Sequence, residues 1–346
     1  MIQIFTDGAL AYDSRLESYD LAGLKVTTGL NKGGTAEITM PAGHPAYEKY
    51  TSYKTIVEIY RDGALKFRGR ALYPMDDHYN RRTVVCEGEL CFFQDAVSRP
   101  TLYRDAPAVI FAALVQEYNA QVEAVKRFKV GTVTVTDPND YVRLEIGEAE
   151  KMGATLDKLV SRCGGYIVFT TDPEDGARVI NWYESLEYVS DQVIEFGSNL
   201  LTFSRSGANT SLITAIIPYG AKDEESGMRI TIESVNNGVD YIQDDEAVAL
   251  RGRITAPVVW DDVTKPANLL RKAQQYLEAN RYITTSLELS ALDLSYMDKS
   301  IDNYRVGDNV RVISKPHGVD EYFLLTERTE DLLNPLNSKI TLGKSK

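Results

Sequence analysis

The fold is decided by one hairpin, which reads Lys54-Thr55-Ile56-Val57-Glu58-Ile59-Tyr60, then Arg61-Asp62-Gly63, then Leu65-Lys66-Phe67-Arg68-Gly69-Arg70. Apolar and polar side chains alternate with a period of two in both outer runs, which is typical of β-strands with one buried face. The Asp-Gly pair between them is a strong signal for a tight hairpin turn. This stretch therefore predicts two antiparallel strands.

Similar segments surround the hairpin. The run from Thr35 to Met40 alternates before it, and the run from Arg81 to Glu87 alternates after it. Short alternating strands separated by turns are typical of a small barrel or sandwich. We therefore expect a first β-barrel over residues 1–98.

The period changes after Pro100. Asp105 is a plausible N-cap with Pro107 in the first turn, and an apolar stripe follows at helical spacing up to Tyr118. A second helical stripe runs from Met152 to Cys163, where Gly164-Gly165 predicts the helix end. With the strands that follow, residues 104–195 are predicted to form an inserted α+β domain.

Strand patterns resume at residue 200 and close the chain. We expect a second β-barrel from residues 196–225 and 284–343. Between these segments, Thr264 and Pro266 open a helical pattern, so residues 226–283 are predicted to be a small α/β insertion with one helix. The predicted fold class is multidomain and mainly β, with two tube-type β-barrels and smaller peripheral α+β domains.

The two β regions share a weak repeat. In the first region, Ile59 and a turn precede Phe67, Val85 and Gly88. The spacings from Phe67 to Val85 and from Val85 to Gly88 nearly match those of a second set near the C-terminus, which also begins with an apolar residue and a turn. The second set is Val312, Phe323, Ile340 and Gly343. Either the barrel is duplicated or two β meanders resemble each other by chance. Duplication predicts the same strand order in both.

Composition excludes several classes of protein. The chain has 346 residues, enough for two to four domains, and a formal net charge of -12 with scattered Lys and Arg. A nucleic-acid binder would need clustered basic residues, so the charge argues against that class of protein. The start, from Met1 to Asp7, lacks a basic and apolar leader, and no apolar run approaches the ~20 residues of a membrane span. We expect synthesis in a cytoplasm and no membrane association.

The residues that could carry chemistry are sparse. The sequence lacks the motifs of serine hydrolases, zinc proteases, P-loop enzymes and dinucleotide-binding enzymes. Its three histidines lie in turn-like contexts without a ligand partner, its three cysteines suit a reduced core, and its acidic clusters suit solvated loops. Glu87 and Glu89 are a weak acid/base pair because they alternate along a strand end. The residues concerned are His44, His78, His317, Asp76, Asp77, Cys86, Cys91, Cys163, 223–225, 244–246 and 261–262. We expect no catalytic residue, no metal ligand and no cofactor, and hence no enzyme.

Nine short segments, in order along the chain, carry a resemblance to a known family. They are Phe67–Arg70, Val84–Leu90, Gly197–Leu201, Ile216–Ala221, Ala291–Leu294, Val306–Asp308 with Val310, Lys315–Gly318, Asn334-Pro335 and Ile340–Gly343. On these segments the chain resembles the phage and prophage tail hub family, the tail-associated lysin N-terminal region or "prophage endopeptidase tail" family. It is also similar to the baseplate hub of contractile-tailed phages.

The resemblance implies a structural tail protein. Three subunits with two barrels each would form a trimeric ring that presents six tube-like units to the tail. The implied partners are the tail tube, distal tail proteins, the tape-measure protein and a downstream lysin or receptor-binding module, with DNA passing through the ring without specific binding. The implied location is the virion tail, after synthesis in the host bacterial cytoplasm. Relatives carry such a module after this region, so it is either lacking here or lies beyond Lys346.

Two alternative functions stay open. The family label suggests a tail-associated cell-wall hydrolase, a peptidase or glycan hydrolase, although the sequence offers no nucleophile and base at a suitable spacing. A host-envelope carbohydrate-binding module is the other alternative, because exposed aromatic side chains can stack on sugars. Trp182 and Trp260 are its candidate residues.

Overall fold

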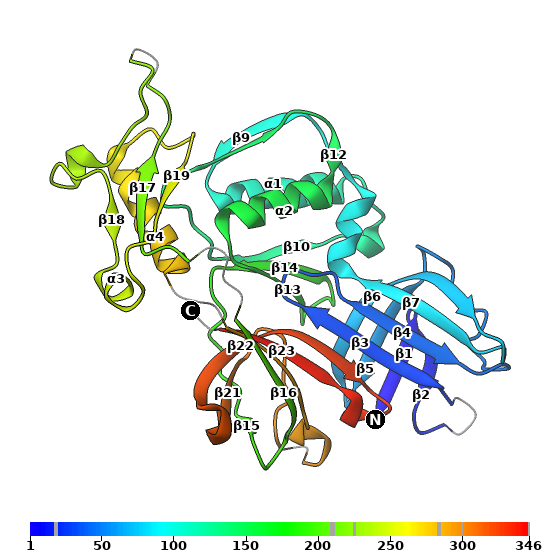
Figure 1. Ribbon diagram of the computed structural model, residues 1–346. Helices are drawn as coiled ribbons and strands as arrows, with labels where there is room; N and C mark the ends of the chain where they lie inside the picture. The colour runs from blue at the N-terminus through cyan, green and yellow to red at the C-terminus, as the bar shows by residue number, and fades with distance from the viewer. Residues whose placement is uncertain (17–19, 208–211, 224–225, 282–284, 299, 345–346) are drawn as a thin grey trace.

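The computed structural model describes residues 1–16, 20–207, 212–223, 226–281, 285–298 and 300–344. The chain is mainly β, with helical layers on one side of a large curled sheet (Figure 1). The predicted fold class is confirmed at this level. Two closed tube-type barrels, and the exact domain boundaries, stay a prediction.

The first strand region contains the predicted hairpin around Asp62-Gly63. It consists of β1 (Ile2–Thr6), β2 (Ala9–Asp13), β3 (Gly23–Gly29), β4 (Thr35–Met40), β5 (Ile56–Arg61), β6 (Ala64–Asp76) and β7 (Arg82–Gly88). The strands lie in the order β3-β4-β7-β6-β5-β1-β2, and all their pairs are antiparallel. Asp62 and Gly63 both have positive φ, as a tight two-residue hairpin turn requires. Ile38, Val57, Ile59, Phe67 and Val84 form part of the buried core.

The second strand region repeats this order. It consists of β15 (Ile194–Glu195), β16 (Leu200–Gly207), β20 (Thr285–Ala291), β21 (Asn309–Ser314), β22 (Val319–Asp331) and β23 (Lys339–Lys344). The order β16-β20-β23-β22-β21 matches β3-β4-β7-β6-β5, with every pair antiparallel and the same succession along the chain. The shared strand order that duplication predicts is therefore present over five strands.

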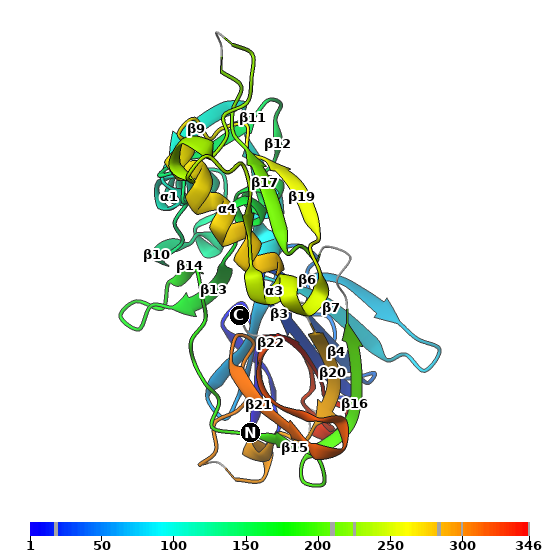
Figure 2. The ribbon, with the colours of Figure 1, turned by 60° about the vertical axis from the view of Figure 1, so that its left-hand side comes forward.

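The two regions are not isolated from each other. The C-terminal half of β22 pairs with β3, from Glu327 opposite Gly29 to Asp331 opposite Lys25. This seam joins both regions into one 13-stranded sheet that curls at each end (Figure 2). No pattern in the sequence indicated this seam.

The inserted module combines two helices with a three-stranded sheet and two strand pairs. The helices are α1 (Pro107–Asn119) and α2 (Met152–Cys163), and the strands are β8 (Val97–Ser98), β9 (Thr101–Asp105), β10 (Lys129–Val133), β11 (Val142–Ile146), β12 (Glu150–Lys151), β13 (Tyr166–Thr171) and β14 (Arg178–Tyr183). The sheet has the order β10-β14-β13, and the strand pairs are β9-β11 and β8-β12. Both predicted helices are present, and α2 ends at Gly164 with φ +75°, as expected. Ala106, and not Asp105, is the N-cap of α1.

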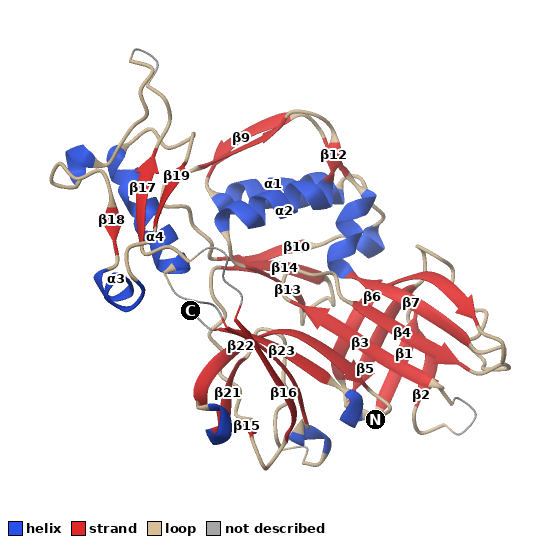
Figure 3. Cartoon of the chain, in the orientation of Figure 1, coloured by secondary structure: helices blue, strands red, loops and turns tan. Residues whose placement is uncertain are grey.

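The smaller insertion differs from its prediction in two respects. It contains two helices, α3 (Asp245–Arg251) and α4 (Pro266–Asn280), where one was expected. Its sheet is β18-β17-β19, with β17 at Ala215–Tyr219, β18 at Ile242–Gln243 and β19 at Thr255–Val259. β17 falls in the segment 196–225 that was assigned to the second barrel, but it pairs with β18 and β19 of the insertion. Figure 3 shows both helical modules on the same side of the curled sheet.

The described helices are all too short or too polar to cross a membrane.

Candidate functional site

A row of three cations on β6 marks the place where the parts of the molecule meet. Lys66, Arg68 and Arg70 alternate with Phe67 and Gly69, so they point away from the core of the first strand region. All three side chains are nevertheless almost fully buried, because other parts of the chain cover this face. Buried charges need paired carboxylates. Lys66 pairs at one junction, and Arg68 and Arg70 pair at a second one.

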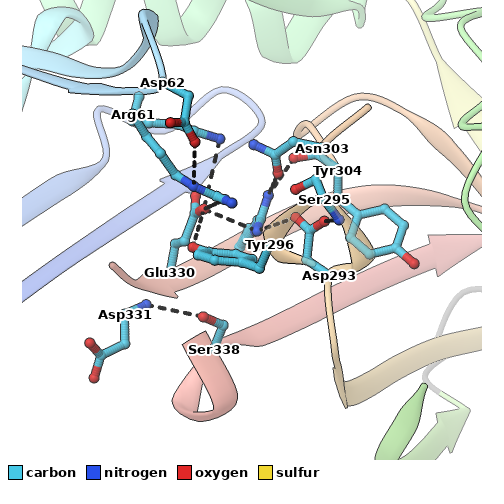
Figure 4. A network of polar contacts seen from close by, with 12 residues as sticks. Arg61, Asp62, Asp293, Ser295, Tyr296, Asn303, Tyr304, Glu330, Asp331 and Ser338 are labelled. Atoms are coloured by element: carbon cyan, nitrogen blue, oxygen red, sulfur yellow. Dashed lines mark hydrogen bonds and ion pairs between the residues drawn. The ribbon is translucent and has the colours of Figure 1, made fainter. Parts of the chain in front are cut away.

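Lys66 belongs to the junction between the two strand regions. There Glu330 of β22 lies 3.4 Å from Arg61, 3.7 Å from Lys66 and 3.2 Å from Arg328. The Tyr296 hydroxyl donates a 2.8 Å hydrogen bond to the same carboxylate, and the Arg61 guanidinium lies 3.2 Å from the Tyr296 ring centroid. Figure 4 shows Arg61 at the end of β5, Glu330 of β22 and Tyr296 in its turn converging on one another. Glu330 thus pairs with cationic side chains of both strand regions.

Arg328 extends this network into the second strand region. Its guanidinium pairs with Asp293 at 2.8 Å and also donates to the Asn303 side chain and the Tyr304 carbonyl. The Gln192 amide donates to the second Asp293 oxygen at 2.9 Å. Burial alone would raise the pKa of Asp293, but Arg328 and hydrogen bonds from Ser295 and Gln192 outweigh it and lower that pKa. The lowered pKa keeps Asp293 a carboxylate that pairs with Arg328.

The charge on Lys66 is the least well compensated in this network. Burial lowers its pKa to about 8, with Arg328 and Arg61 adding repulsion and Glu330 opposing the shift. The unfolded chain therefore holds one proton more than the folded chain between pH 8 and the ordinary lysine value near 10.5. Stability should rise with pH across that window. Below pH 8, the buried charge lowers the free energy of unfolding by about 3 kcal/mol.

We expect Lys66→Met to raise the free energy of unfolding at pH 7 and to remove its increase between pH 8 and 10. Urea unfolding at several pH values would measure both effects. Lys49→Met is the matched control, because that side chain is exposed and should leave the pH profile unchanged. If the stability of the Lys66 variant and that of the natural chain change equally with pH, the lowered pKa of Lys66 is contradicted.

Arg68 and Arg70 lie at the junction with the inserted module. Arg68 pairs with Glu89 at 2.7 Å and donates to the Thr171 hydroxyl of β13 at 3.2 Å. Arg178 of β14 reaches the same Glu89 oxygen at 2.9 Å. Arg70 pairs with Glu87 at 2.6 Å and with Asp95, which also binds Lys126. Carboxylates of β7 and of the segment directly after it thus neutralise the outer face of β6. The inserted module joins the same contacts through Thr171, Arg178 and Lys126.

A third junction holds the two helical modules together. Lys272 of α4 pairs with Asp137 at 2.8 Å, and both side chains are buried. Arg271 binds the Pro138 carbonyl at 2.7 Å and Asp140 at 3.0 Å. Arg162 of α2 pairs with Asp262. Each helical module is therefore attached by ion pairs to its neighbour, which favours fixed relative positions.

A cavity of about 450 Å³ lies where the two strand regions and the inserted module meet. Its walls include Lys66, Arg68, Glu89, Arg328 and Glu330. Lys66 pairs with Glu330 across the two strand regions, and Arg68–Glu89 and Arg328–Glu330 are further ion pairs of this wall. The cavity is thus part of the same network.

The histidines and cysteines do not assemble a reactive centre. His78 is exposed beside Tyr79, His44 is buried in a turn where its Nδ1 accepts from the Ala46 amide, and His317 stacks on Phe203 at 4.4 Å. Burial raises the pKa of Cys86 and of Cys163 to about 12 and that of Cys91 to about 11, so all three are thiols at neutral pH. A thiol is a poor nucleophile.

The carboxylates that were considered for chemistry serve structural roles. Glu87 and Glu89 are held by the arginines of β6, and Asp76 and Asp77 pair with Arg82 and Arg81. Within the described ranges, no three His, Cys, Asp or Glu side chains gather as metal ligands would.

The acidic clusters were expected in solvated loops, but most of their side chains cap a helix or form ion pairs. Asp244 is the N-cap of α3, where it accepts from the Ala247 amide at 2.7 Å, and Asp245 and Glu246 form the first helical turn. This position is favourable for acidic side chains because of the helix dipole. Asp261 pairs with Arg229, and Asp223 accepts from Ser226 in a turn. Residues 224 and 225 lie outside the described residues.

The two tryptophans give little support to sugar binding. Trp182 is fully buried against Phe111 and donates to the Gly164 carbonyl. Trp260 is half-buried and packs edge-on against Tyr276 of α4. Both aromatic rings contribute to module cores.

The network residues Arg61, Lys66, Asp293, Arg328 and Glu330 were not singled out from the sequence. One signal was available, since Lys66, Arg68 and Arg70 alternate along a strand whose opposite face is a core. An alternating strand with a solvated face gives the same pattern.

Comparisons with known proteins agree with this architecture. Residues 188–346 match the model of the family described as "Prophage endopeptidase tail". The chain is similar to the prophage tail protein gp18 from Listeria monocytogenes EGD-e, with 15% identity, a TM-score of 0.65, and coverage of 100% of this chain and 94% of that one. It is also similar to the tail protein from Neisseria meningitidis MC58, with 12% identity, a TM-score of 0.66, and coverage of 99% and 96%.

The chain is also similar to a protein of a bacterial secretion system. The c3393 protein of E. coli, a component of the type VI secretion system with structural similarity to the T4 tail proteins gp27 and gp5, matches with 12% identity and a TM-score of 0.52. The match covers 98% of this chain and 75% of that one. No curated protein matches in sequence. The resemblance to the phage and prophage tail family is confirmed, and the chain has the fold of phage tail proteins.

Proposed function

We propose that this chain, with its tail-protein fold, is a baseplate or tail-tip hub subunit that assembles into a trimeric ring. The ring joins the tail tube to distal tip components and lets DNA pass. The observation that carries the proposal is the strand order that occurs twice in one continuous sheet. Two tube-like units per chain make six in a trimer, which matches a sixfold tail tube.

The ion-paired junctions support a structural role. A subunit that transmits a fixed geometry from tube to tip needs its parts held rigidly. The charge pairs Arg61–Glu330, Arg178–Glu89 and Lys272–Asp137 each join two parts of the chain, and their side chains are almost fully buried. The site offers no activated nucleophile, because its thiols are protonated and its carboxylates are paired with arginines. We infer a subunit without enzymatic activity, located in the virion tail after synthesis in the host cytoplasm.

Partners follow from this position in the tail. The proposed neighbours are the tail tube, distal tail proteins, the tape-measure protein and a lysin or receptor-binding module. Three chains carry three times the net charge of -12. An acidic or neutral inner wall would repel phosphate, so DNA could pass without binding.

A mass measurement in solution tests the proposal. Analytical ultracentrifugation of the purified chain should give three times the monomer mass of 38.6 kDa at micromolar to millimolar concentration. The ratio of trimer to monomer should rise with protein concentration. A chain that stays monomeric throughout this range, and also in the presence of tail tube protein, would refute the ring.

A further inference from the structure

We propose that the protruding end of β6 in one copy pairs with the outer edge of β16 in a second copy of this chain. This contact repeats, between chains, the seam that β22 and β3 form within one chain. The inference rests on the proposed ring and specifies the surfaces that would close it.

The first step is that β6 and β22 are equivalent strands. Both have 13 residues, and both shift register at a bulge, directly after Ala71 in β6 and directly after Leu325 in β22. The Ala71 amide donates to the Thr55 carbonyl and its own carbonyl accepts from Tyr53. The Leu325 amide and carbonyl bond the loop before β21 in the same way, through Asp308 and Gly307.

The second step concerns the edges of these two strands. On β22, one edge carries β23, and the other carries β21 up to Leu324 and then β3 from Glu327 to Asp331. On β6, one edge carries β7 to Asp76, and the other carries β5 only as far as Arg70. In the described part of the chain, no strand occupies the remaining edge at residues 72–76. This open edge is the counterpart of the place that β3 fills on β22.

The third step is that β16 is the counterpart of β3. Val26 of β3 lies opposite Ala36, and Ala36 lies opposite Cys86. Arg205 of β16 lies opposite Leu287, and Leu287 lies opposite Leu342. Cys86 and Leu342 in turn pair with the equivalent residues Ala71 and Leu325. β16 is also the last strand of the sheet, and its outer edge pairs with no described strand.

The equivalence fixes a register for the contact between copies. Because Glu330 lies opposite Val26 and Thr329 opposite Thr27, Asp76 should lie opposite Arg205 of the second copy and Met75 opposite Ser206. An acidic and a basic side chain thus face each other across the contact, which stabilises an antiparallel pair.

The protruding end of β6 also has apolar side chains that lack cover in the single chain. Tyr73 is 49% exposed and Met75 is 48% exposed. Pro74 lies between them and has no amide N–H, so this edge offers one ladder hydrogen bond fewer than the seam, where Arg328 is the equivalent residue. Exposed apolar side chains beside an open strand edge still favour pairing with another chain. Each chain supplies one open β6 end and one open β16 edge. Since the two surfaces differ, the contact is head-to-tail and can close a ring.

Cysteine cross-linking tests the register. A mixture of the single variants Met75→Cys and Ser206→Cys should form a covalent dimer under mild oxidation, and the double variant should form a ladder up to the closed ring. Both positions are at the surface of the single chain. The band should disappear with a reducing agent. The unsubstituted chain, whose three cysteines are not fully exposed, controls for background disulfides.

A register control completes the design. Met75→Cys mixed with Arg205→Cys shifts the pair by one residue, which points the two side chains to opposite faces, so cross-linking should fall to background. Equal cross-linking in both registers would overturn the proposed pairing. A trimer by ultracentrifugation without any Met75–Ser206 cross-link would overturn the edge pairing and leave the ring intact. A chain that is monomeric and does not cross-link would overturn both.

Discussion

Replacing Arg328 by alanine is expected to lower the free energy of unfolding by about 3–5 kcal/mol, because it removes one partner of a buried ionic network. The Arg328 side chain is 4% exposed and contacts both Asp293 and Glu330. Without it, the Asp293 carboxylate loses its only ion-pair partner among the described residues while it stays buried. Urea unfolding followed by tryptophan fluorescence and circular dichroism would measure the loss.

The control is another arginine paired near the same strand. Arg311 of β21 pairs with Asp320 of β22 at 2.9 Å, but its side chain is 42% exposed. Exposed pairs contribute little to stability, so Arg311→Ala should leave the unfolding midpoint within experimental error. Equal effects of the two substitutions would show that burial of the network does not matter. Faster amide hydrogen exchange in β3 and β22 of the Arg328 variant would place the damage at the seam.

Much of the fold could be predicted from local patterns. The period-two runs around Asp62-Gly63 specify β5 and β6 because each strand has one buried face, and a tight turn between them fixes their register. The apolar residues at helical spacing that end at Tyr118 and Cys163 specify α1 and α2, because each helix also has one buried face. The spacing repeat between residues 59–88 and 312–343 also indicated the shared strand order.

The seam and the charged network could not be predicted in this way. Whether β22 ends in solvent or pairs with β3 depends on a contact between residues some 300 positions apart in sequence. Lys66, Arg68 and Arg70 have the pattern of a solvated strand face, and only the position of the other modules buries them. Alternation reports which side of a strand is apolar, and it does not report what covers the polar side.

The helix α3 was missed for a different reason. Asp244, Asp245 and Glu246 suggested a solvated loop, yet an N-cap followed by acidic residues is also a helix start. The apolar part of this helix is short, and only Ala247 is buried. With so little periodicity, capping was the single signal available.

Replacing Gly88 by alanine is expected to destabilise the chain by about 3 kcal/mol or more, because the new methyl group has no room. A Cβ at this position would lie 1.8 Å from the carbonyl oxygen of Gly33, which is backbone and cannot move aside cheaply. Gly88 lies opposite Gly69 at the end of the β6–β7 pair and donates its amide to the Gly34 carbonyl. The absence of a side chain therefore permits the close approach of β7 to the chain before β4.

Gly147→Ala is the matched control for this substitution. No heavy atom lies within 4 Å of a Cβ built at Gly147, and no positive φ strains the backbone there. Alanine should leave stability unchanged or raise it by up to about 1 kcal/mol, through the lower entropy of the unfolded chain. Thermal unfolding of both variants gives the comparison. A Gly88→Ala variant that melts with the unsubstituted chain would show that β7 and the segment at Gly33 can separate without cost, which would contradict the tight strand packing on which the first strand region depends.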